Sequence, residues 1–365
     1  MNKIGFNPFS KNLVLGFSKT WKEAVTHWAK TVSIIAAVAA CSIQPLMATH
    51  PQSLTEKKIV RAAFDLGSGD FKLCVVDASQ GNLKILLQKV IAVNLGTDCN
   101  VNKGTLSETI QAKALEALKE LQAEAKREGA TNFCGVATAV FRNATNGQDL
   151  LKRLQETSQI PLRIITQEEE GKLGFLTGTA IFPQIPQEEL LLLDIGSSSI
   201  QITANNETYG ADIGTSRIPQ IFAEKIRHQT YSPGMLFDSI TDEEILKLSE
   251  LIINQIPESN WQIQRILSGK AHLTFADYPS FLDTLEQATL KKDTLPIEDL
   301  LQGIQRLKDP SFPLKNVSEE RRQFRAFSFT LIYSLMKKFG HEKIHLAINE
   351  TGNASGVAFN EEFWR

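Results

Sequence analysis

The sequence predicts an α/β protein made of two similar halves. The tetrapeptide Asp65-Leu66-Gly67-Ser68 returns as Asp194-Ile195-Gly196-Ser197, and each copy lies between an apolar run and an alternating one. That pattern is typical of a strand, a tight turn and a returning strand. With 365 residues, of which 42% are hydrophobic and 22% charged, the chain is long enough for about two globular domains.

The first half reads strand, strand, strand, helix, strand, helix, strand. Three strand-like runs lie between Val60 and Val93, with a turn at Gln80-Gly81-Asn82. The segment Leu106 to Arg127 has apolar residues at helical spacing and ends at Gly129. The remaining segments are a strand near Phe133 to Thr138, a helix near Gly147 to Thr157 and a strand at Leu162 to Ile165.

The second half starts another such unit, at Leu190 to Asp212. Helical segments punctuated by prolines follow from Pro219 to Phe339, and the stretch from His345 to Ile348 reads as a last central strand. We therefore expect the second half to carry helical additions that the first half lacks.

The two repeated turns are candidates for a binding site. In each copy the Asp ends a buried strand, where a carboxylate is costly unless it binds a cation or a donor. The small turn residues leave backbone N–H groups open to an anion such as phosphate. Two such turns facing each other would clamp a phosphate chain and its metal, whereas the alternative is two ordinary hairpins that share Asp-Gly chemistry.

The acidic run Glu168 to Glu170 is a second candidate. Thr166 with Glu169 fits a helix-start capping box, and acids in a first turn favour the helix dipole whatever else they do. Helical spacing separates the three glutamates: Glu168 aligns with Lys172 and Glu169 with Lys172 and Leu173, whereas Glu170 aligns with the apolar and small face from Leu173 to Gly178. We expect Glu170 on the inward side of this helix, where burying a carboxylate is costly unless it has a binding partner or a function.

The same residues carry a family resemblance. The stretch Ala62 to Ser68 resembles the opening phosphate loop of the exopolyphosphatase / guanosine pentaphosphate phosphohydrolase family, which belongs to the sugar kinase, heat-shock and actin superfamily. Further segments match in order between Ile59 and Arg365: Ala137 to Ala144 with Asn146, Ile165 to Leu173, Leu193 to Gly196 and, late in the chain, Ser318 to Arg322. Ser268-Gly269 weakly resembles a further small-residue turn. Several motifs in order are more specific than any one of them.

The resemblance implies two ribonuclease-H-like lobes of the actin-like superfamily with a cleft between them. The first lobe would span residues 59–182. The second would span residues 183–365 and carry the helical additions, with its final residues a candidate for a return to the first lobe. A homodimer is a candidate assembly.

The resemblance also implies the activity, which is release of terminal phosphate from inorganic polyphosphate or guanosine pentaphosphate with Mg²⁺. Glu170 matches the family's general base on the attacking water. Asp65 and Asp194 would hold the metal, because hard divalent cations prefer oxygen ligands. The expected phosphate-binding residues are Gly67, Ser68, Arg142, Gly196, Ser197 and Ser198.

Several residues depart from the family pattern. Ser197 and Ser198 stand where the family loop has glycines, so a positive φ there would be strained. Gln201 replaces a Glu that could support the metal. Asp70 adds a negative charge, which Lys72 could compensate. The alternative function is therefore a catalytically weakened protein of the same fold that binds or senses a phosphorylated ligand.

The first 48 residues differ from the rest. Residues 1–30 carry five lysines against one glutamate, and Thr31 to Ala48 has no charge, which is typical of an export signal. Ala48 could end a cleavage site, and Cys41 closes a segment that resembles a lipoprotein box. We expect an export signal or N-terminal anchor over 1–48 and a linker over 49–58, with a periplasmic or inner-membrane-anchored protein. A cytoplasmic protein, with a misassigned start or a buried N-terminal helix, is the alternative.

Composition argues against other functions. The net charge of −2 provides no basic field for nucleic acid, and the only membrane contact expected is through the N-terminal segment. Beyond the leader, Cys74, Cys99 and Cys134 have no close spacing, so they indicate neither a disulfide framework nor a zinc knuckle.

The segment from His341 to His345 matches the zinc-protease pattern His-Glu-x-x-His. That chemistry needs both histidines on one face of a helix. Gly340 reads as a helix stop and the following residues as a strand, on which the two histidines would stand about 13 Å apart. We therefore expect no zinc-protease site.

Overall fold

The computed structural model describes residues 58–79, 83–204, 207–256, 271–277 and 279–365. The expected leader, nearly all of the linker, the turn at 80–82 and Ser268-Gly269 lie outside these ranges. None of the helices in the described ranges combines the length and apolar character that crossing a membrane requires.

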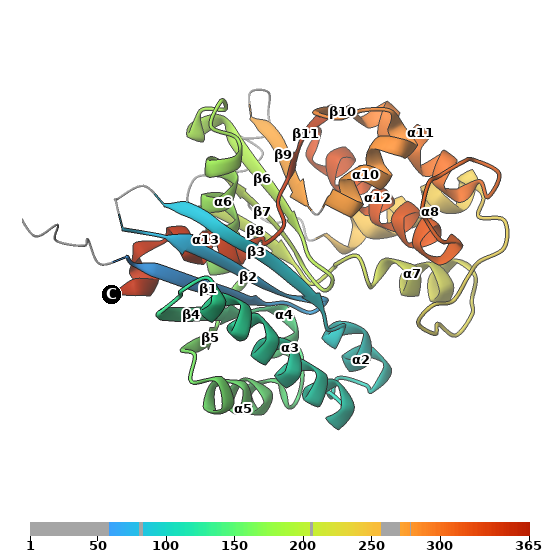
Figure 1. Ribbon diagram of the computed structural model, residues 1–365. Coiled ribbons are helices and arrows are strands. Elements are labelled where there is room, and N and C mark those ends of the chain that lie inside the picture. Colours follow the sequence, from blue (N-terminus) through green and yellow to red (C-terminus); the bar gives the residue numbers. More distant parts are fainter. Residues whose placement is uncertain (1–57, 80–82, 205–206, 257–270, 278) are drawn as a thin grey trace, which may run out of the picture. The chain divides into compact units, whose positions relative to one another are not determined.

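The first lobe contains a mixed sheet of five strands (Figure 1). Its strands are β1 (Val60–Leu66), β2 (Asp70–Asp77), β3 (Lys84–Ala92), β4 (Asn132–Ala137) and β5 (Leu162–Ile164). They lie in the order β3-β2-β1-β4-β5. The first three strands are antiparallel, while β4 and β5 run parallel to β1. The strand at the centre, β1, delivers Asp65 to the edge where the repeated turn begins.

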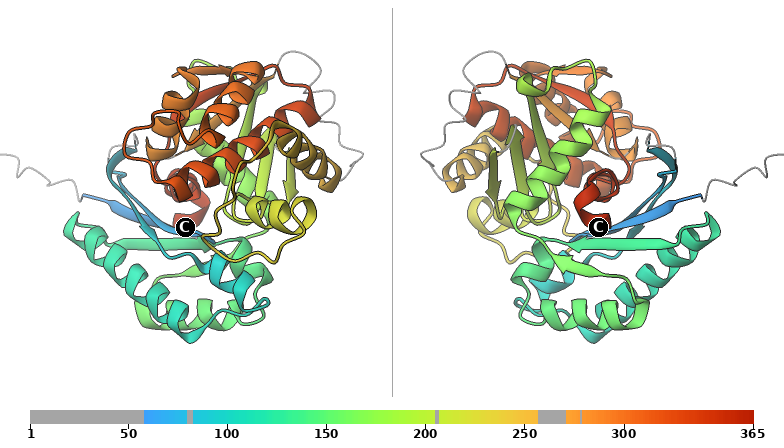
Figure 2. Two further views of the ribbon diagram at one scale, coloured as in Figure 1. Left: turned by 90° about the vertical axis from the view of Figure 1, so that its right-hand side faces the viewer. Right: turned by 90° about the vertical axis from the view of Figure 1, so that its left-hand side faces the viewer.

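Helices cover both faces of this sheet (Figure 2). On one face are α3 (Glu108–Arg127) and α5 (Gly147–Ser158), whose apolar sides share a core with Phe64 and Leu73. Two short helices, α2 (Leu95–Val101) and α4 (Ala139–Asn143), complete this lobe. The prediction of α3 is confirmed, and Ser107 begins the helix by accepting a hydrogen bond from the N–H of Ile110.

The second lobe contains a mixed sheet of six strands in the order β10-β11-β9-β6-β7-β8 (Figure 1). These are β6 (Leu190–Ile195), β7 (Ile200–Ala204), β8 (Glu207–Ala211), β9 (His272–Asp277), β10 (Thr294–Pro296) and β11 (Lys343–Ile348). The helical additions are α7 (Ile218–Ile221) with a π-helical turn (Phe222–Ile226), α8 (Asp242–Gln255), α10 (Pro279–Thr289), α11 (Ile297–Lys308) and α12 (Glu319–Phe339). The β6–β7 hairpin repeats the geometry of β1–β2, as the sequence predicts.

Helix α13 (Asn353–Phe359), followed by a short 3-10 helix (Glu361–Trp364), covers the other face of the first sheet. Helix α6 (Gln167–Ile181) packs against α13 and against β6, β7 and β8 of the second sheet. Ala63, Leu173 and Val357 share one core cluster there. The helices approach closely at Gly356, where an added Cβ would lie 2.2 Å from the carbonyl oxygen of Leu173. The chain thus ends on the first sheet after completing the second.

The expected fold class is confirmed: an α/β chain with two lobes, each built on a mixed sheet. The exclusion of a zinc protease also agrees with the structure. Gly340, at φ 73°, ends α12, and β11 begins at Lys343. His341 and His345 therefore do not share a helix.

Candidate active site

A cavity of about 1050 Å³ lies where the two repeated turns meet. Both turns line it, together with α6, the amino-terminal part of α12 and the segment before α13. The predicted site residues that line it are Asp65, Gly67, Ser68, Glu170, Asp194, Gly196, Ser197 and Ser198. The structure therefore brings together residues that are far apart in the sequence, and Arg142 alone of the predicted set does not line this cavity.

Asp65 is a buried carboxylate at the end of β1, with only 2% of its surface exposed. It pairs in register with Lys72 on β2, whose Nζ lies 3.7 Å from Oδ2. Burial raises the pKa of Asp65 to about 6; the charge of Lys72 opposes that rise and the charge of Asp194 adds to it. Burial also raises the pKa of Asp194, again against the charge of Lys72. The charge of Lys72 therefore lowers the pKa of both aspartates. From the sequence we expected Lys72 to compensate only the charge of Asp70.

The two aspartates fit a hard divalent cation. The Oδ1 atom of Asp65 is buried and has no hydrogen-bond partner. Magnesium is commonly held by one or two carboxylates, with water and substrate oxygens completing its shell. Among the residues that the structure describes, no three His, Cys, Asp or Glu side chains form a metal-holding group. Asp65 and Asp194 thus suit a cation that shares its coordination with a ligand.

Glu170 lies in the first turn of α6, which begins with the predicted capping box between Thr166 and Glu169. Its side chain is buried, and its Oε2 lies 2.9 Å from Nη1 of Arg142. The same Nη1 donates a hydrogen bond of 2.7 Å to the carbonyl of Ile165, so Arg142 is anchored on both sides. Burial raises the pKa of Glu170 to about 8; the charge of Arg142 opposes this, and both aspartates add to it.

The ion pair changes the expectation for Arg142. The family resemblance implied that Arg142 binds phosphate, but the structure directs this side chain to Glu170 and the backbone of Ile165. An arginine at this place orients the carboxylate and lowers the cost of its ionisation. Direct phosphate binding by Arg142 stays a prediction.

The two turns use their amide groups unequally. The N–H of Gly67 donates to the carbonyl of Asp70, and the N–H of Gly196 donates to that of Ser199, so both close their own turns. Within the described ranges, the amides of Ser68 and Ser197 donate no hydrogen bond. These second-position amides therefore remain open to an anion.

The serines of the second turn are not strained. Among the described residues, neither Ser197 nor Ser198 has a positive φ. The expected cost of replacing the family glycines is therefore absent. Gln201 is buried and donates a hydrogen bond to the hydroxyl of Ser199, so it helps to hold the turn between β6 and β7.

Two glycines keep room beside the carboxylates. A Cβ on Gly174 would lie 3.3 Å from Oδ2 of Asp194, and one on Gly352 would lie 3.0 Å from Nζ of Lys72. Gly352 has φ 49°, a conformation that side chains rarely adopt. The adjacent Asn353 has a buried Oδ1 without a hydrogen-bond partner. Sequence reasoning missed Gly352 and Asn353, although a small polar turn after the predicted last strand was the available signal.

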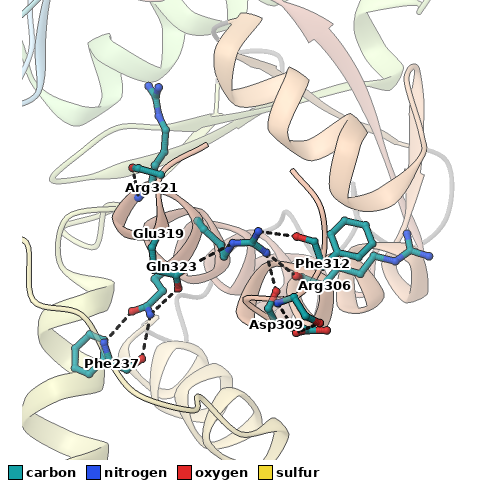
Figure 3. A network of polar contacts seen from close by, with 10 residues as sticks. Phe237, Arg306, Asp309, Phe312, Glu319, Arg321 and Gln323 are labelled. Atoms are coloured by element: carbon teal, nitrogen blue, oxygen red, sulfur yellow. Dashed lines mark hydrogen bonds and ion pairs between the residues drawn. The ribbon is translucent and has the colours of Figure 1, made fainter. Parts of the chain in front are cut away.

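The two arginines of the late motif from Ser318 to Arg322 have different surroundings (Figure 3). Arg322 is buried and donates to three carbonyl groups, those of Arg306, Asp309 and Phe312. Arg321 points away from that network and lines the cavity. Arg322 therefore holds the loop after α11 in place, while Arg321 is free to meet a ligand.

Arg325, also on α12, is a second cation that lines the cavity, and it was not predicted from the sequence. Its guanidinium lies 4.4 Å from the ring centroid of Phe281, and its Nε is buried without a hydrogen-bond partner. Burial lowers its pKa to about 10, against the attraction of Asp277. A partly desolvated guanidinium stacked on an aromatic ring is a favourable partner for a phosphate group.

The architecture and this cavity define a class. Each of the two lobes has a strand-turn-strand unit whose first strand carries an aspartate near its end. The two units meet at a carboxylate-lined cavity that has basic residues on its second-lobe side. The Ppx/GppA phosphatase family model matches residues 74–362, and the chain belongs to that family. The family resemblance expected from the motifs is confirmed.

Solved structures agree on the fold. The Ppx/GppA family member of Aquifex aeolicus is similar with a TM-score of 0.63 and 18% identity, over 82% of this chain and 96% of that one. An exopolyphosphatase from Cytophaga hutchinsonii is similar with a TM-score of 0.64 and 17% identity, over 82% and 96%. At such identities the likeness shows the fold alone.

A curated protein, the bifunctional 3-dehydroquinate synthase/phosphatase of Fusobacterium nucleatum subsp. nucleatum, is 25% identical over 189 residues. The match covers 48% of this chain and 28% of that protein. The chain therefore corresponds to less than a third of that relative's length.

Proposed function

We propose that this chain is a Mg²⁺-dependent phosphohydrolase that releases terminal phosphate from inorganic polyphosphate or a guanosine polyphosphate. The observation that carries the proposal is Glu170: a buried carboxylate, oriented by Arg142, in the same cavity as Asp65 and Asp194. Family membership supports the phosphatase class, and the exopolyphosphatase among the similar structures supports the substrate class.

Glu170 is suited to act on water. A carboxylate accepts a proton best when its pKa lies near the working pH, and burial moves the pKa of Glu170 to about 8. The ion pair with Arg142 fixes the side chain, so the free carboxylate oxygen can orient a water molecule toward phosphorus. In this role Glu170 takes the proton of the attacking water.

The phosphate chain would lie between the two turns. The open amides of Ser68 and Ser197 would donate to phosphate oxygens. Asp65 and Asp194 would hold Mg²⁺, which when bound neutralises charge on those oxygens. Arg321 and Arg325 would bind the more distant part of the same ligand.

The rival function is a sensor that binds the same ligand without turnover. Its main support from the sequence was strain at Ser197 and Ser198, and the unstrained backbone at both positions weakens that support. The raised pKa of Glu170 still favours a neutral carboxyl at pH 7, which would slow a general base.

The test is phosphate release from both substrate classes by the full chain, with Mg²⁺ and with a chelator. The Glu170→Gln variant should lose about 10²–10⁴-fold in turnover while it still binds ligand. The matched control is Glu168→Gln, because Glu168 lies in the same helical turn but points outward to Lys172. Undiminished turnover in Glu170→Gln would refute the assignment of the base. Binding without turnover in the native chain would establish the sensor.

A further inference from the structure

Two histidines from different strands face each other on the second sheet. His272 begins β9 and His345 lies on β11, the neighbouring parallel strand. Nδ1 of His272 and Nε2 of His345 share a hydrogen bond of 3.0 Å, in which one ring donates its N–H to the other. Leu273 packs into the main core of the lobe from the opposite face of β9, so the two imidazoles lie on the other face of the sheet. His345 was singled out by the zinc-protease pattern, but its actual partner is a residue that no motif contains.

The separation of the two nitrogens suits a shared metal ion. Imidazole nitrogens bind transition metals at about 2.0–2.1 Å, so two nitrogens 3.0 Å apart subtend an angle of about 90° at such an ion. A tetrahedral angle would place them about 3.3 Å apart. Angles near 90° are typical of square-planar or tetragonal Cu(II) and Ni(II), and imidazole is a suitable ligand for both.

Glu189 supplies the supporting group. Its Oε2 lies 3.5 Å from Nε2 of His272, the ring nitrogen that faces away from His345. A carboxylate behind a metal-binding histidine fixes the ring and raises its basicity. Both side chains are partly open to solvent, at 35% for His272 and 42% for Glu189, so water can complete the coordination. Burial, His272 and Lys343 all lower the pKa of His345, which keeps that ring in its neutral, ligating form.

We propose that His272 and His345 together bind one Cu(II) or Ni(II) ion through their facing nitrogens, with Glu189 orienting His272. The described part of the chain offers no group of three donor side chains for a metal, so the protein contributes two nitrogens and water supplies the rest. The positive charge of Lys343 acts on His345 and would oppose a cation there. The site joins β9 and β11, whose carboxyl ends deliver Asp277 and Asn349 to the cavity.

The experiment titrates Cu(II) and Ni(II) into the metal-free full chain, with isothermal calorimetry and, for copper, electron paramagnetic resonance. We expect one site with nitrogen coordination and a rise in Tm, because an ion that binds the native state stabilises it. His272→Gln and His345→Gln should each weaken binding at least about tenfold, and Glu189→Gln should weaken it about tenfold as well. His228→Gln is the control, since His228 lies on another segment and is exposed.

The melting temperature of each variant without metal shows whether it is folded. Copper binding that is unchanged in a folded His272→Gln, His345→Gln double variant would overturn the proposal. Binding lost equally in the His228 variant would overturn it too.

Discussion

Replacing Glu170 by Gln removes a carboxylate that the fold makes costly to ionise. Burial raises its pKa from 4.5 to about 8, although Arg142 lies 2.9 Å away. The folded state therefore favours the protonated form. The stability that this difference contributes is fully present below about pH 4.5 and is lost as the pH rises through about 8. At about 1.36 kcal/mol per pKa unit, the full span is on the order of 5 kcal/mol.

The assay is urea unfolding of the native chain and the Glu170→Gln variant at several values between pH 4.5 and 8.5. The free energy of unfolding of the native chain should fall with pH relative to the variant, which has no proton to lose at this position. Asp65 contributes a loss of the same sign between its ordinary pKa of 3.8 and about 6, and it does so in both proteins. The difference between the two curves therefore isolates Glu170.

A matched control is Glu168→Gln, which should follow the native curve because Glu168 is exposed and ion-paired to Lys172. Parallel curves for the native chain and Glu170→Gln would refute the reasoning, since they would mean that Glu170 ionises as it does in the unfolded chain. In the same range, phosphate release by the native chain should increase with pH as the base ionises.

Four further outcomes are expected. Asp194→Asn should abolish the Mg²⁺ dependence of phosphate release and lower the pKa of Asp65, measured by side-chain NMR, because a neighbouring negative charge is removed. Ser197→Gly combined with Ser198→Gly should change turnover less than about threefold, since neither residue has a positive φ; a gain of tenfold or more in phosphate release would reveal strain. Arg325→Gln should raise KM about tenfold or more with little change in kcat, if its guanidinium binds a phosphate remote from the reacting one; a kcat defect alone would contradict that role. A fusion of residues 1–60 to an export-dependent reporter should be active, and a reporter that stays inactive would favour the cytoplasmic alternative.

Much of the fold could be predicted because it rests on local patterns. The two turns follow buried strands and use small residues, so their hairpins are visible in the sequence. The capping box at Thr166 was predicted and is present, and helical spacing alone separated Glu170 from its two neighbours. Its burial agrees with that reasoning.

The partners of these residues could not be predicted in the same way. Arg142 reaches Glu170 from α4, which is separated from α6 in the chain by α5 and β5, and spacing along the chain says nothing about that approach. Arg325 and Gly352 reach the cavity from the second half of the chain, where the family motifs are sparse. His272 meets His345 only because β9 and β11 are neighbours in the sheet. Each of these contacts depends on long-range strand order.

The charges around Glu170 connect its stability cost to its proposed role. When Asp65, Asp194, Lys72 and Arg142 all carry their charges, the two negative and two positive groups balance. Burial is the main reason that the pKa of Glu170 is raised to about 8, and ionised Glu170 also adds one uncompensated negative charge beside the two aspartates. Glu170 would lose that proton more readily if additional positive charge reached the two aspartates, because an opposite charge nearby favours the ionised form. A phosphate ligand that arrives with its cation would therefore convert Glu170 into a base at neutral pH, whereas the same ligand without a cation would oppose that ionisation. On this reasoning the cleft couples its general base to the occupied state, and the comparison of Mg²⁺ with chelator reports on the ionisation of Glu170 as well as on binding.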